Sequence, residues 1–259
     1  MDLHLRGKRA FVTGSTQGIG FAIAEALAAE GAAVVLNGRD AARLRAAADR
    51  LRTFFPETRV DVAPGDIADP AALADLAEVD ILVNNAGAFG LSEFETTDDA
   101  EWQRYLDVNL LAGVRLSRRL LPGMLTRGWG RIVFIASESG VNVPADMIPY
   151  GVSKAATIAL GNGLAKLTRG SEVTVNTVLG GPTYSAGVAS VVEAIAAAQD
   201  LPAEAVAASV IGANQTTLLQ RFIRPDEIAG LVAYLASPRA SAVNGAALRA
   251  DGGVLTGIL

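Results

Sequence analysis

The sequence predicts an α/β protein with a mostly parallel, roughly seven-stranded sheet and helices on both faces. Short apolar segments alternate with longer helical segments along almost the whole chain of 259 residues. Most of the short segments are apolar on both faces and lack the alternation expected of a half-exposed strand. Strands of this kind, joined by right-handed helical crossovers, give a doubly wound, Rossmann-type domain.

The individual elements follow from local patterns and end signals. Gly31, a common cap residue, closes the first expected helix, and Pro225 lies in the first turn of the last. We expect strands at residues 8–14, 32–38, 59–66, 80–87, 131–137, 173–179 and 245–253. We expect helices at residues 19–31, 41–51, 70–78, 101–127 and 225–237, and a further helix that begins at residue 148.

No linker or low-complexity tract divides the chain, so residues 1–259 are predicted to form one domain. An alanine-rich segment at residues 183–221 departs from the strand–helix alternation. Long segments that leave the carboxyl end of a strand often cover a ligand site. We therefore expect this segment to form a helical lid.

The composition and charge of the chain exclude several classes of binding partner. Hydrophobic residues make up 51% of the chain and charged residues 19%, and the net charge is −5. Nucleic acids and anionic membranes select basic surfaces, so neither is expected as a partner. The chain has no cysteine and one histidine, His4, so we expect no metal site. The N-terminus lacks a signal-peptide pattern and the apolar runs are short, so we expect a soluble, cytoplasmic protein.

The stretch TGSTQGIG (13–20) joins the first expected strand to the first expected helix. Unpaired N–H groups and the positive end of the helix dipole can bind a dinucleotide pyrophosphate there. Gly14, Gly18 and Gly20 would permit the tight turn and the close approach of the phosphates. The spacing differs from the common G-x-G-x-x-G. Its position after the first strand nevertheless favours nucleotide binding over a turn without function.

Two further strand ends are expected to contact the adenosine half of such a cofactor. An acid after the second strand suits the 2′-hydroxyl of NAD, whereas an arginine suits the 2′-phosphate of NADP. In LNGRD (36–40), Gly38 lies at the position of the acid and Arg39 follows it. Arg39 favours NADP, with NAD as the alternative; it would otherwise be an ordinary solvated arginine. NNAG (84–87), at the end of the fourth strand, would face the adenine side.

A tyrosine and a lysine lie one turn apart in IPYGVSKAATIAL (148–160). Their i, i+4 spacing places Tyr150 and Lys154 on one helix face, which the polar edge of a packed helix would also explain. Ser153, between them, is expected to point elsewhere. Ser137 ends the preceding strand, at the carboxyl edge of the sheet where α/β proteins bind ligands. That location favours chemistry over mere amphipathicity.

In combination, these motifs resemble the short-chain dehydrogenase/reductase family, in its short single-domain branch. The likeness runs from about residue 8 to residue 253, with further marks in DVNLLAG, GGPTYS and ADGG. Each motif is weak alone, but their order and spacing together are specific. The resemblance, which extends to 3-oxoacyl-carrier-protein reductases, implies an NAD(P)-dependent oxidoreductase that interconverts a carbonyl and a secondary alcohol by hydride transfer.

The resemblance also implies roles for individual residues. Its catalytic set corresponds to Asn109, Ser137, Tyr150 and Lys154, with Asn109 holding a proton-relay water. Its cofactor contacts correspond to Gly14, Ser15, Ile19, Gly20, Asp66, Ile67, Asn85, Ala86, Gly87, Tyr150, Lys154, Pro182 and Thr183. A phenol has a pKa of about 10, so proton transfer near neutral pH needs roughly 4 kcal/mol of preferential phenolate stabilisation. Lys154 is expected to supply much of it.

The substrate is less constrained. No lysine or arginine lies between Arg169 and Arg221, so the expected lid offers no cation for a carboxylate or phosphate. The wall of the expected substrate site is mostly apolar, formed by Val141, Met147, Tyr184 and Val188. Its candidate polar contacts are Glu138, Asn142 and Asp146. A neutral ketone or secondary alcohol is favoured, including the 3-oxoacyl compounds common in the family.

Two alternatives stay open. One is a non-catalytic, nucleotide-sensing Rossmann protein, against which the intact Ser–Tyr–Lys set argues. The other is a sugar-nucleotide epimerase or dehydratase, which can share Y-x-x-x-K but usually carries an added substrate domain and a basic diphosphate clamp. The resemblance also implies a homotetramer, in which the helices at 101–127 and 150–168 pair across a symmetric interface.

Overall fold

Seven parallel strands form the centre of the computed structural model, which describes residues 2–213 and 216–258. The strands are Arg9–Val12 (β1), Ala33–Gly38 (β2), Val60–Pro64 (β3), Ile81–Asn84 (β4), Trp129–Ser137 (β5), Glu172–Gly180 (β6) and Ala247–Ala250 (β7). Their order is β3-β2-β1-β4-β5-β6-β7, and every neighbouring pair is parallel. The order reverses between β1 and β4, where open α/β sheets bind ligands. The predicted doubly wound α/β fold is confirmed.

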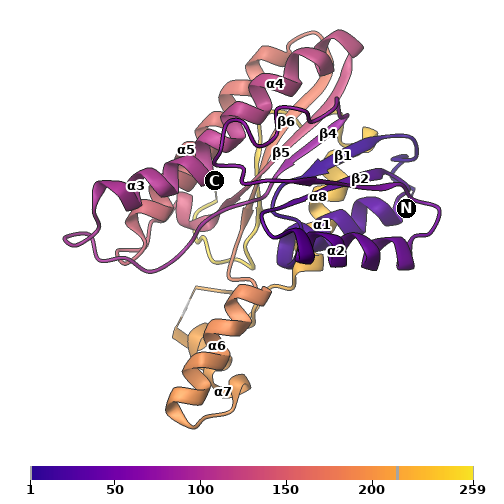
Figure 1. The fold of residues 1–259 in the computed structure, drawn as a ribbon. Coiled ribbons are helices and arrows are strands. Elements are labelled where there is room, and N and C mark those ends of the chain that lie inside the picture. Colours follow the sequence, from indigo (N-terminus) through magenta and orange to yellow (C-terminus); the bar gives the residue numbers. More distant parts are fainter. Residues whose placement is uncertain (1, 214–215, 259) are drawn as a thin grey trace.

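Helices cover both faces of this sheet (Figure 1). One layer contains Gly18–Ala29 (α1), Ala41–Phe54 (α2) and Pro225–Ala236 (α8), and the other contains Asp99–Leu106 (α3), Ala112–Arg127 (α4) and Ile148–Ala165 (α5). Successive side chains of a strand point to opposite faces, so the neighbours Phe11 and Val12 of β1 enter different cores. Val12 packs with Leu27 of α1, and Phe11 packs with Leu120 of α4. All four side chains are fully buried.

The helix expected at residues 101–127 is present but is not regular throughout. α3 begins after Asp98, whose side chain accepts a hydrogen bond from the backbone N–H of Glu101 at 2.8 Å. A π-helical turn, Asp107–Leu111, joins α3 to α4 and carries Asn109 at its centre. Single π-helical turns within α-helices are frequent at functional sites.

The prediction of a short helix at residues 70–78 is wrong, because this segment forms a series of turns. Its backbone bonds span three residues, as in Leu76 N–H to the Leu73 carbonyl. The guanidinium of Arg119 on α4 donates to the carbonyl oxygens of Leu73 and Leu76, so a side chain satisfies acceptors that a helix would pair internally. A segment this short forms a helix only marginally by itself, and burial of the two leucines sets its path instead.

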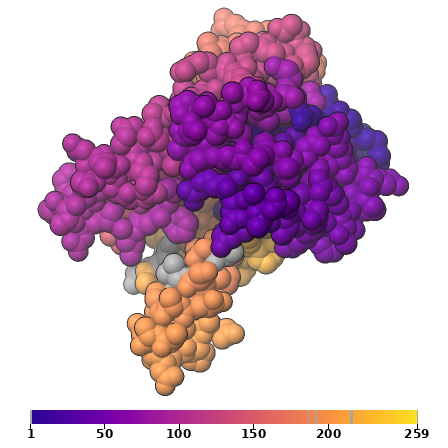
Figure 2. Space-filling model, viewed as in Figure 1, coloured from indigo at the N-terminus to yellow at the C-terminus, as the bar shows by residue number. Residues whose placement is uncertain are grey.

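The segment expected to be a lid contains two helices, Ala186–Gln199 (α6) and Ala203–Ala213 (α7), which project from the body (Figures 1 and 2). They share a small core of Val192, Ala196 and Val206. The helical part of that expectation is therefore correct, while residues 214–215 lie outside the described residues. Across the described chain, no single helix has the length and apolarity to cross a membrane, although α6 and α7, bent by 110°, meet the length and composition criteria together.

Candidate active site

The turn between β1 and α1 brings the chain too close to itself for side chains at two glycines. Gly14 has φ +59°, and a Cβ there would lie 2.9 Å from Cα of Ala86. A Cβ on Gly20 would lie 2.3 Å from the Gly14 carbonyl oxygen. Gln17, before α1, makes no side-chain cap, so the first N–H groups of the helix face the cleft with no side chain across them. This geometry fits a pyrophosphate at the helix N-terminus.

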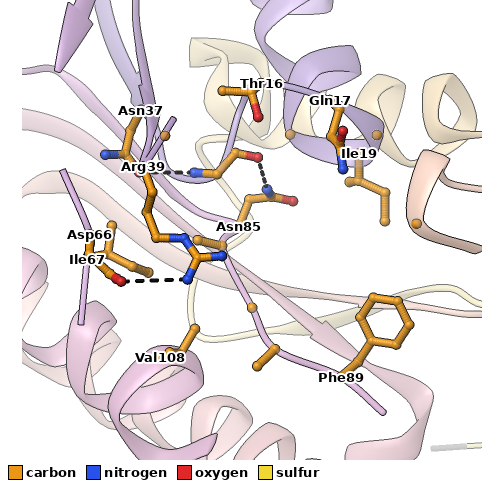
Figure 3. Close-up of a pocket in the computed structure, with 18 of the residues that line it drawn as sticks. Thr16, Gln17, Ile19, Asn37, Arg39, Asp66, Ile67, Asn85, Phe89 and Val108 are labelled. Carbon is orange, nitrogen blue, oxygen red and sulfur yellow. Dashed lines mark hydrogen bonds and ion pairs between the residues drawn. The ribbon is translucent and has the colours of Figure 1, made fainter. Parts of the chain in front are cut away.

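A cleft of about 420 Å³ opens in front of this turn (Figure 3). Most of the residues predicted to contact a cofactor line it: Gly14, Gly18, Ile19, Gly20, Arg39, Asp66, Ile67, Asn85, Ala86 and Gly87. Residues that the sequence did not single out complete the wall, among them Thr16, Asn37, Phe89, Arg104 and Val108. The arrangement follows the carboxyl ends of β1, β2, β3 and β4, and its shape and polar main chain suit a dinucleotide.

Several of the predicted cofactor residues have side chains that hold the cleft together. Ser15 is fully buried, and its hydroxyl donates to the Val12 carbonyl oxygen at 2.8 Å. The Asn85 amide donates to the carbonyl oxygens of Thr13 and Gly14, at 2.9 and 3.1 Å. The Ser15 side chain therefore does not reach the cleft, and that of Asn85 ties the phosphate turn to the end of β4.

Asn37 is a structural residue of the cleft that the sequence analysis missed. It is buried near the end of β2, and its amide donates to the carbonyl oxygens of Ala63 and Gly65, at 3.0 and 3.2 Å. Its carbonyl oxygen accepts from the Gly14 N–H at 3.2 Å. One side chain thus joins β2, the end of β3 and the phosphate turn. The available signal was a polar residue inside an otherwise apolar strand.

Arg39 extends along the wall of the cleft toward Asp66 and Ile67 (Figure 3). Its side chain is 79% exposed, and Nη1 lies 3.7 Å from a carboxylate oxygen of Asp66. An ion pair this exposed contributes little stability, so the guanidinium is free to turn toward an anionic ligand. The neighbouring Asp40 caps α2, because its carboxylate accepts from the N–H groups of Ala42 and Arg43.

Three elements carry the four candidate catalytic residues, two of which lie beside Gly87. Ser137 ends β5, Tyr150 and Lys154 lie in α5, and Asn109 lies in the π-helical turn. A Cβ on Gly87 would lie 3.3 Å from Oδ1 of Asn109 and 3.4 Å from Nζ of Lys154. Lys154 Nζ is 5.6 Å from the centroid of the Tyr150 ring, and Ser137 is close enough to the phenol to lower its pKa. The glycine leaves space for a ligand between the cleft and these groups.

The expectation that Ser153 points away from the catalytic residues is wrong. Ser153 is fully buried, and its hydroxyl accepts from the Asn109 amide at 2.8 Å. The same hydroxyl donates to the Tyr150 carbonyl oxygen at 2.6 Å. Asn109 also donates to the Ala88 carbonyl oxygen and accepts from the Ala88 N–H. Ser153 therefore links α5 to the π-helical turn and fixes the Asn109 side chain.

Burial dominates the electrostatics of the Tyr–Lys pair. It raises the pKa of Tyr150 to about 12; hydrogen bonding with Ser137 opposes this rise, and the charge of Glu138 adds to it. It also lowers the pKa of Lys154 to about 8. The expected lowering of the Tyr150 pKa by Lys154 is not met in the protein alone. The ammonium instead donates to the Ile135 carbonyl oxygen at 2.9 Å.

Pro182 and Thr183 lie where the chain leaves β6 for α6. The Pro182 carbonyl oxygen accepts from the Ile223 N–H at 2.8 Å, and Thr183 pairs with Ile223 in a parallel bridge. Neither residue lines the cleft, whereas Ser185 and Gly187 just beyond them do. The paired segment holds the two ends of the lid together, and the cleft is lined by the residues that follow it.

Known proteins share both this fold and this sequence pattern. The family described as short chain dehydrogenase matches residues 8–196. The oxidoreductase YvaG of Bacillus subtilis is 42% identical, with 100% of both chains covered. A 3-oxoacyl-[acyl-carrier-protein] reductase of Aquifex aeolicus is 30% identical over 98% of this chain and 100% of its own. L-sorbose reductase from Gluconobacter frateurii, solved with NADPH and L-sorbose, superposes with a TM-score of 0.94 at 33% identity, covering 100% of both chains.

The fold, the cleft and these similarities define a nicotinamide-dependent oxidoreductase. The chain belongs to the short-chain dehydrogenase/reductase family, as its motifs predict. Its activity at this level is the transfer of a hydride between a nicotinamide cofactor and a carbonyl or secondary alcohol.

Proposed function

We propose that the protein is an NADP-preferring reductase of neutral ketones, with Tyr150 as the proton donor. The observation that carries the proposal is that Lys154 lies both beside Tyr150, 5.6 Å from its ring centroid, and beside Gly87 in the wall of the nucleotide cleft, with Ser137 close to the phenol. A nucleotide sensor has no need of a phenol, a hydroxyl and a buried ammonium at this point. This favours catalysis over nucleotide sensing.

Each residue of the site has a separate task in this proposal. The bound nicotinamide supplies the hydride and, when oxidised, a positive charge. Tyr150 gives its phenolic proton to the oxygen on which negative charge develops. Ser137 donates a hydrogen bond that holds this oxygen at the phenol. Lys154 offsets the charge of the phenolate that remains and is placed to hold the cofactor ribose.

In this proposal Asn109 holds neighbouring elements of the site in place. Its side-chain amide bonds to Ala88 and Ser153, and its main-chain carbonyl oxygen accepts from the Thr157 hydroxyl at 3.1 Å. These bonds fix the π-helical turn against α5 and against the strand end beside Gly87. The proton-relay water that the family resemblance implies would bind at this turn.

The preference for NADP rests on the environment of Gly38. A Cβ on Gly38 would lie 2.5 Å from Cγ2 of Thr16, so an acid that binds the NAD ribose is not accommodated without displacing Thr16. Arg39 follows, exposed and weakly paired with Asp66. A guanidinium binds a phosphate through two parallel hydrogen bonds, which suits the 2′-phosphate of NADP.

The proposed substrate is a neutral ketone. The lid segment between Arg169 and Arg221 contains no lysine or arginine, so it provides no cation for an acidic substrate. This also disfavours a sugar-nucleotide epimerase or dehydratase, which needs a diphosphate clamp. Two of the three named relatives are a 3-oxoacyl-[acyl-carrier-protein] reductase and an L-sorbose reductase, and the ketone group that each reduces is neutral. We propose that α6 and α7 cover this substrate as a lid.

A cytoplasmic homotetramer is the proposed assembly. α5 exposes Val152, and the turn after it exposes Leu167, which supplies apolar area for pairing with a second copy. Light scattering coupled to gel filtration tests this part alone, with a mass of four chains as the expected result. A monomer at micromolar concentration would contradict it.

The test of the proposed function is a turnover panel of ketones, including L-sorbose and an acetoacetyl thioester, each with NADPH and with NADH. We expect turnover of at least one neutral ketone and a higher kcat/KM with NADPH. Tight NADPH binding without turnover across the panel would support the nucleotide-sensing alternative. A preference for NADH would contradict the role of Arg39.

A further inference from the structure

Glu138 is a carboxylate in the catalytic centre that the proposed reaction does not use. It follows Ser137 directly, in the 3-10 turn Glu138–Gly140 after β5. The Ser137 hydroxyl donates to one of its carboxylate oxygens, and the Ser139 hydroxyl donates to the other at 3.3 Å. The side chain is half-buried. An acceptor-only group therefore holds the hydrogen that the reacting oxygen needs.

No cation balances this carboxylate. Glu138 takes part in none of the ion pairs formed within residues 2–213 and 216–258. The nearby Lys154 donates instead to the Ile135 carbonyl oxygen. Burial raises the pKa of Glu138, and hydrogen bonds from Ser137, Ser139 and the main chain offset that rise only in part. A donor brought by a ligand would therefore stabilise it.

The position of Glu138 opposes ketone reduction in two ways. Its charge raises the pKa of Tyr150, although the reaction leaves a phenolate there. It also accepts the only hydrogen of the Ser137 hydroxyl, which then has none to give to a substrate oxygen. A glutamine or an apolar residue at position 138 would remove the first effect. The second effect vanishes if the substrate itself donates to Glu138 and releases Ser137.

We propose that Glu138 is a specificity-determining residue whose carboxylate accepts a hydrogen bond from a hydroxyl group on the carbon next to the reacting carbonyl. The substrate class is then the hydroxy ketones, and in reverse the vicinal diols, in preference to plain ketones or 3-oxoacyl thioesters. The inference rests on the proposed function and narrows it. A substrate without this hydroxyl leaves the Ser137 hydrogen on Glu138, and a site built to pair a substrate hydroxyl discriminates strongly against the analogue that lacks it.

The experiment compares matched substrates in matched variants. Acetoin and 2-butanone differ by one hydroxyl next to the carbonyl, and NADPH oxidation gives kcat/KM for both. For the wild-type protein we expect at least a 30-fold preference for acetoin. In Glu138→Gln the preference should fall toward 1, mainly through a higher KM for acetoin. Glu57→Gln, an exposed acid ahead of β3, is the control and should keep the wild-type ratio.

The contradicting results are distinct. Equal loss of kcat for both substrates in Glu138→Gln would show that Glu138 only positions Ser137. A wild-type preference for 2-butanone or for an acetoacetyl thioester would overturn the substrate class, and a preference for aminoacetone over hydroxyacetone would replace the hydroxyl by an ammonium group. These results would leave the proposed reductase function standing. Absence of turnover on every ketone, with NADPH bound, would instead be a failure of the proposed function itself.

Discussion

Main-chain atoms dominate one end of the candidate active site, and side chains dominate the other. At the phosphate turn, the main chain forms the surface, and Gly14 and Gly20 leave no room for a Cβ. Near Gly87, the side chains of the proposed catalytic residues Tyr150 and Lys154 have pKa values that burial moves far from ordinary. The first end should therefore bind the cofactor more weakly when a Cβ atom is added. The second should lose catalytic activity when a functional group is removed, and the removal of a buried charged group should make the folded protein more stable.

The largest effect at the phosphate turn is expected for Gly20→Ala. The added Cβ would lie 2.3 Å from the Gly14 carbonyl oxygen and 2.4 Å from the Asn85 amide nitrogen. Relief of this contact displaces the turn, and we expect NADPH to bind about 100-fold more weakly, equivalent to roughly 3 kcal/mol. Fluorescence titration of NADPH measures this. Gly230→Ala is the control, because a Cβ there meets nothing within 4 Å; unchanged affinity in Gly20→Ala would contradict the close packing.

At the catalytic end, Lys154→Met should stabilise the fold at neutral pH relative to alkaline pH. Burial lowers the pKa of Lys154 to about 8 from 10.5. Between these values the unfolded chain binds more protons than the folded chain, so wild-type stability rises with pH. Below pH 8 the folded protein holds a buried ammonium at a cost of about 2–3 kcal/mol. The advantage of the methionine variant should shrink by about 2 kcal/mol from pH 7 to pH 10.

Urea unfolding at pH 7, 8.5 and 10 measures the Lys154 effect. Tyr150, whose pKa burial raises, lowers stability above pH 10, but it does so in both proteins and cancels in the difference. A difference between variant and wild type that does not change with pH would show that the ammonium is hydrated in the folded protein.

A smaller effect is expected for Arg39→Ser, which removes an exposed cation without disturbing the fold. We expect KM for NADPH to rise about tenfold, or about 1.4 kcal/mol, with KM for NADH nearly unchanged. Steady-state kinetics with both cofactors at a fixed ketone concentration gives the two values. The Arg39 interpretation would be wrong if both KM values rose equally.

Features that depend on residues close together in the chain could be predicted from the sequence. The strand–helix alternation, the glycines of TGSTQGIG and the i, i+4 pair Tyr150 and Lys154 each appear in a short window, and so the fold and the candidate set could be predicted. The turns at residues 70–78 could not, because Arg119, more than forty residues away, supplies their donors. The same holds for Ser153, whose role depends on Asn109 in another element.

Burial and charge were also beyond the sequence. The i, i+4 spacing places Lys154 near Tyr150, but it gives neither the desolvation that raises the pKa of Tyr150 nor the carbonyl of Ile135 that binds the ammonium. Glu138 appeared in the sequence only as one of several candidate polar contacts. Its hydrogen bond with Ser137 became visible only in the structure.

The central claim is that Tyr150 donates the proton while the main chain of the phosphate turn binds the cofactor. Tyr150→Phe keeps the ring and removes only the phenolic oxygen. Its single-turnover rate of ketone reduction, measured by NADPH absorbance alongside NADPH affinity, tests the claim most directly. We expect the rate to fall about 1,000-fold with the dissociation constant of NADPH unchanged within about twofold. A rate near that of the wild type would contradict the account.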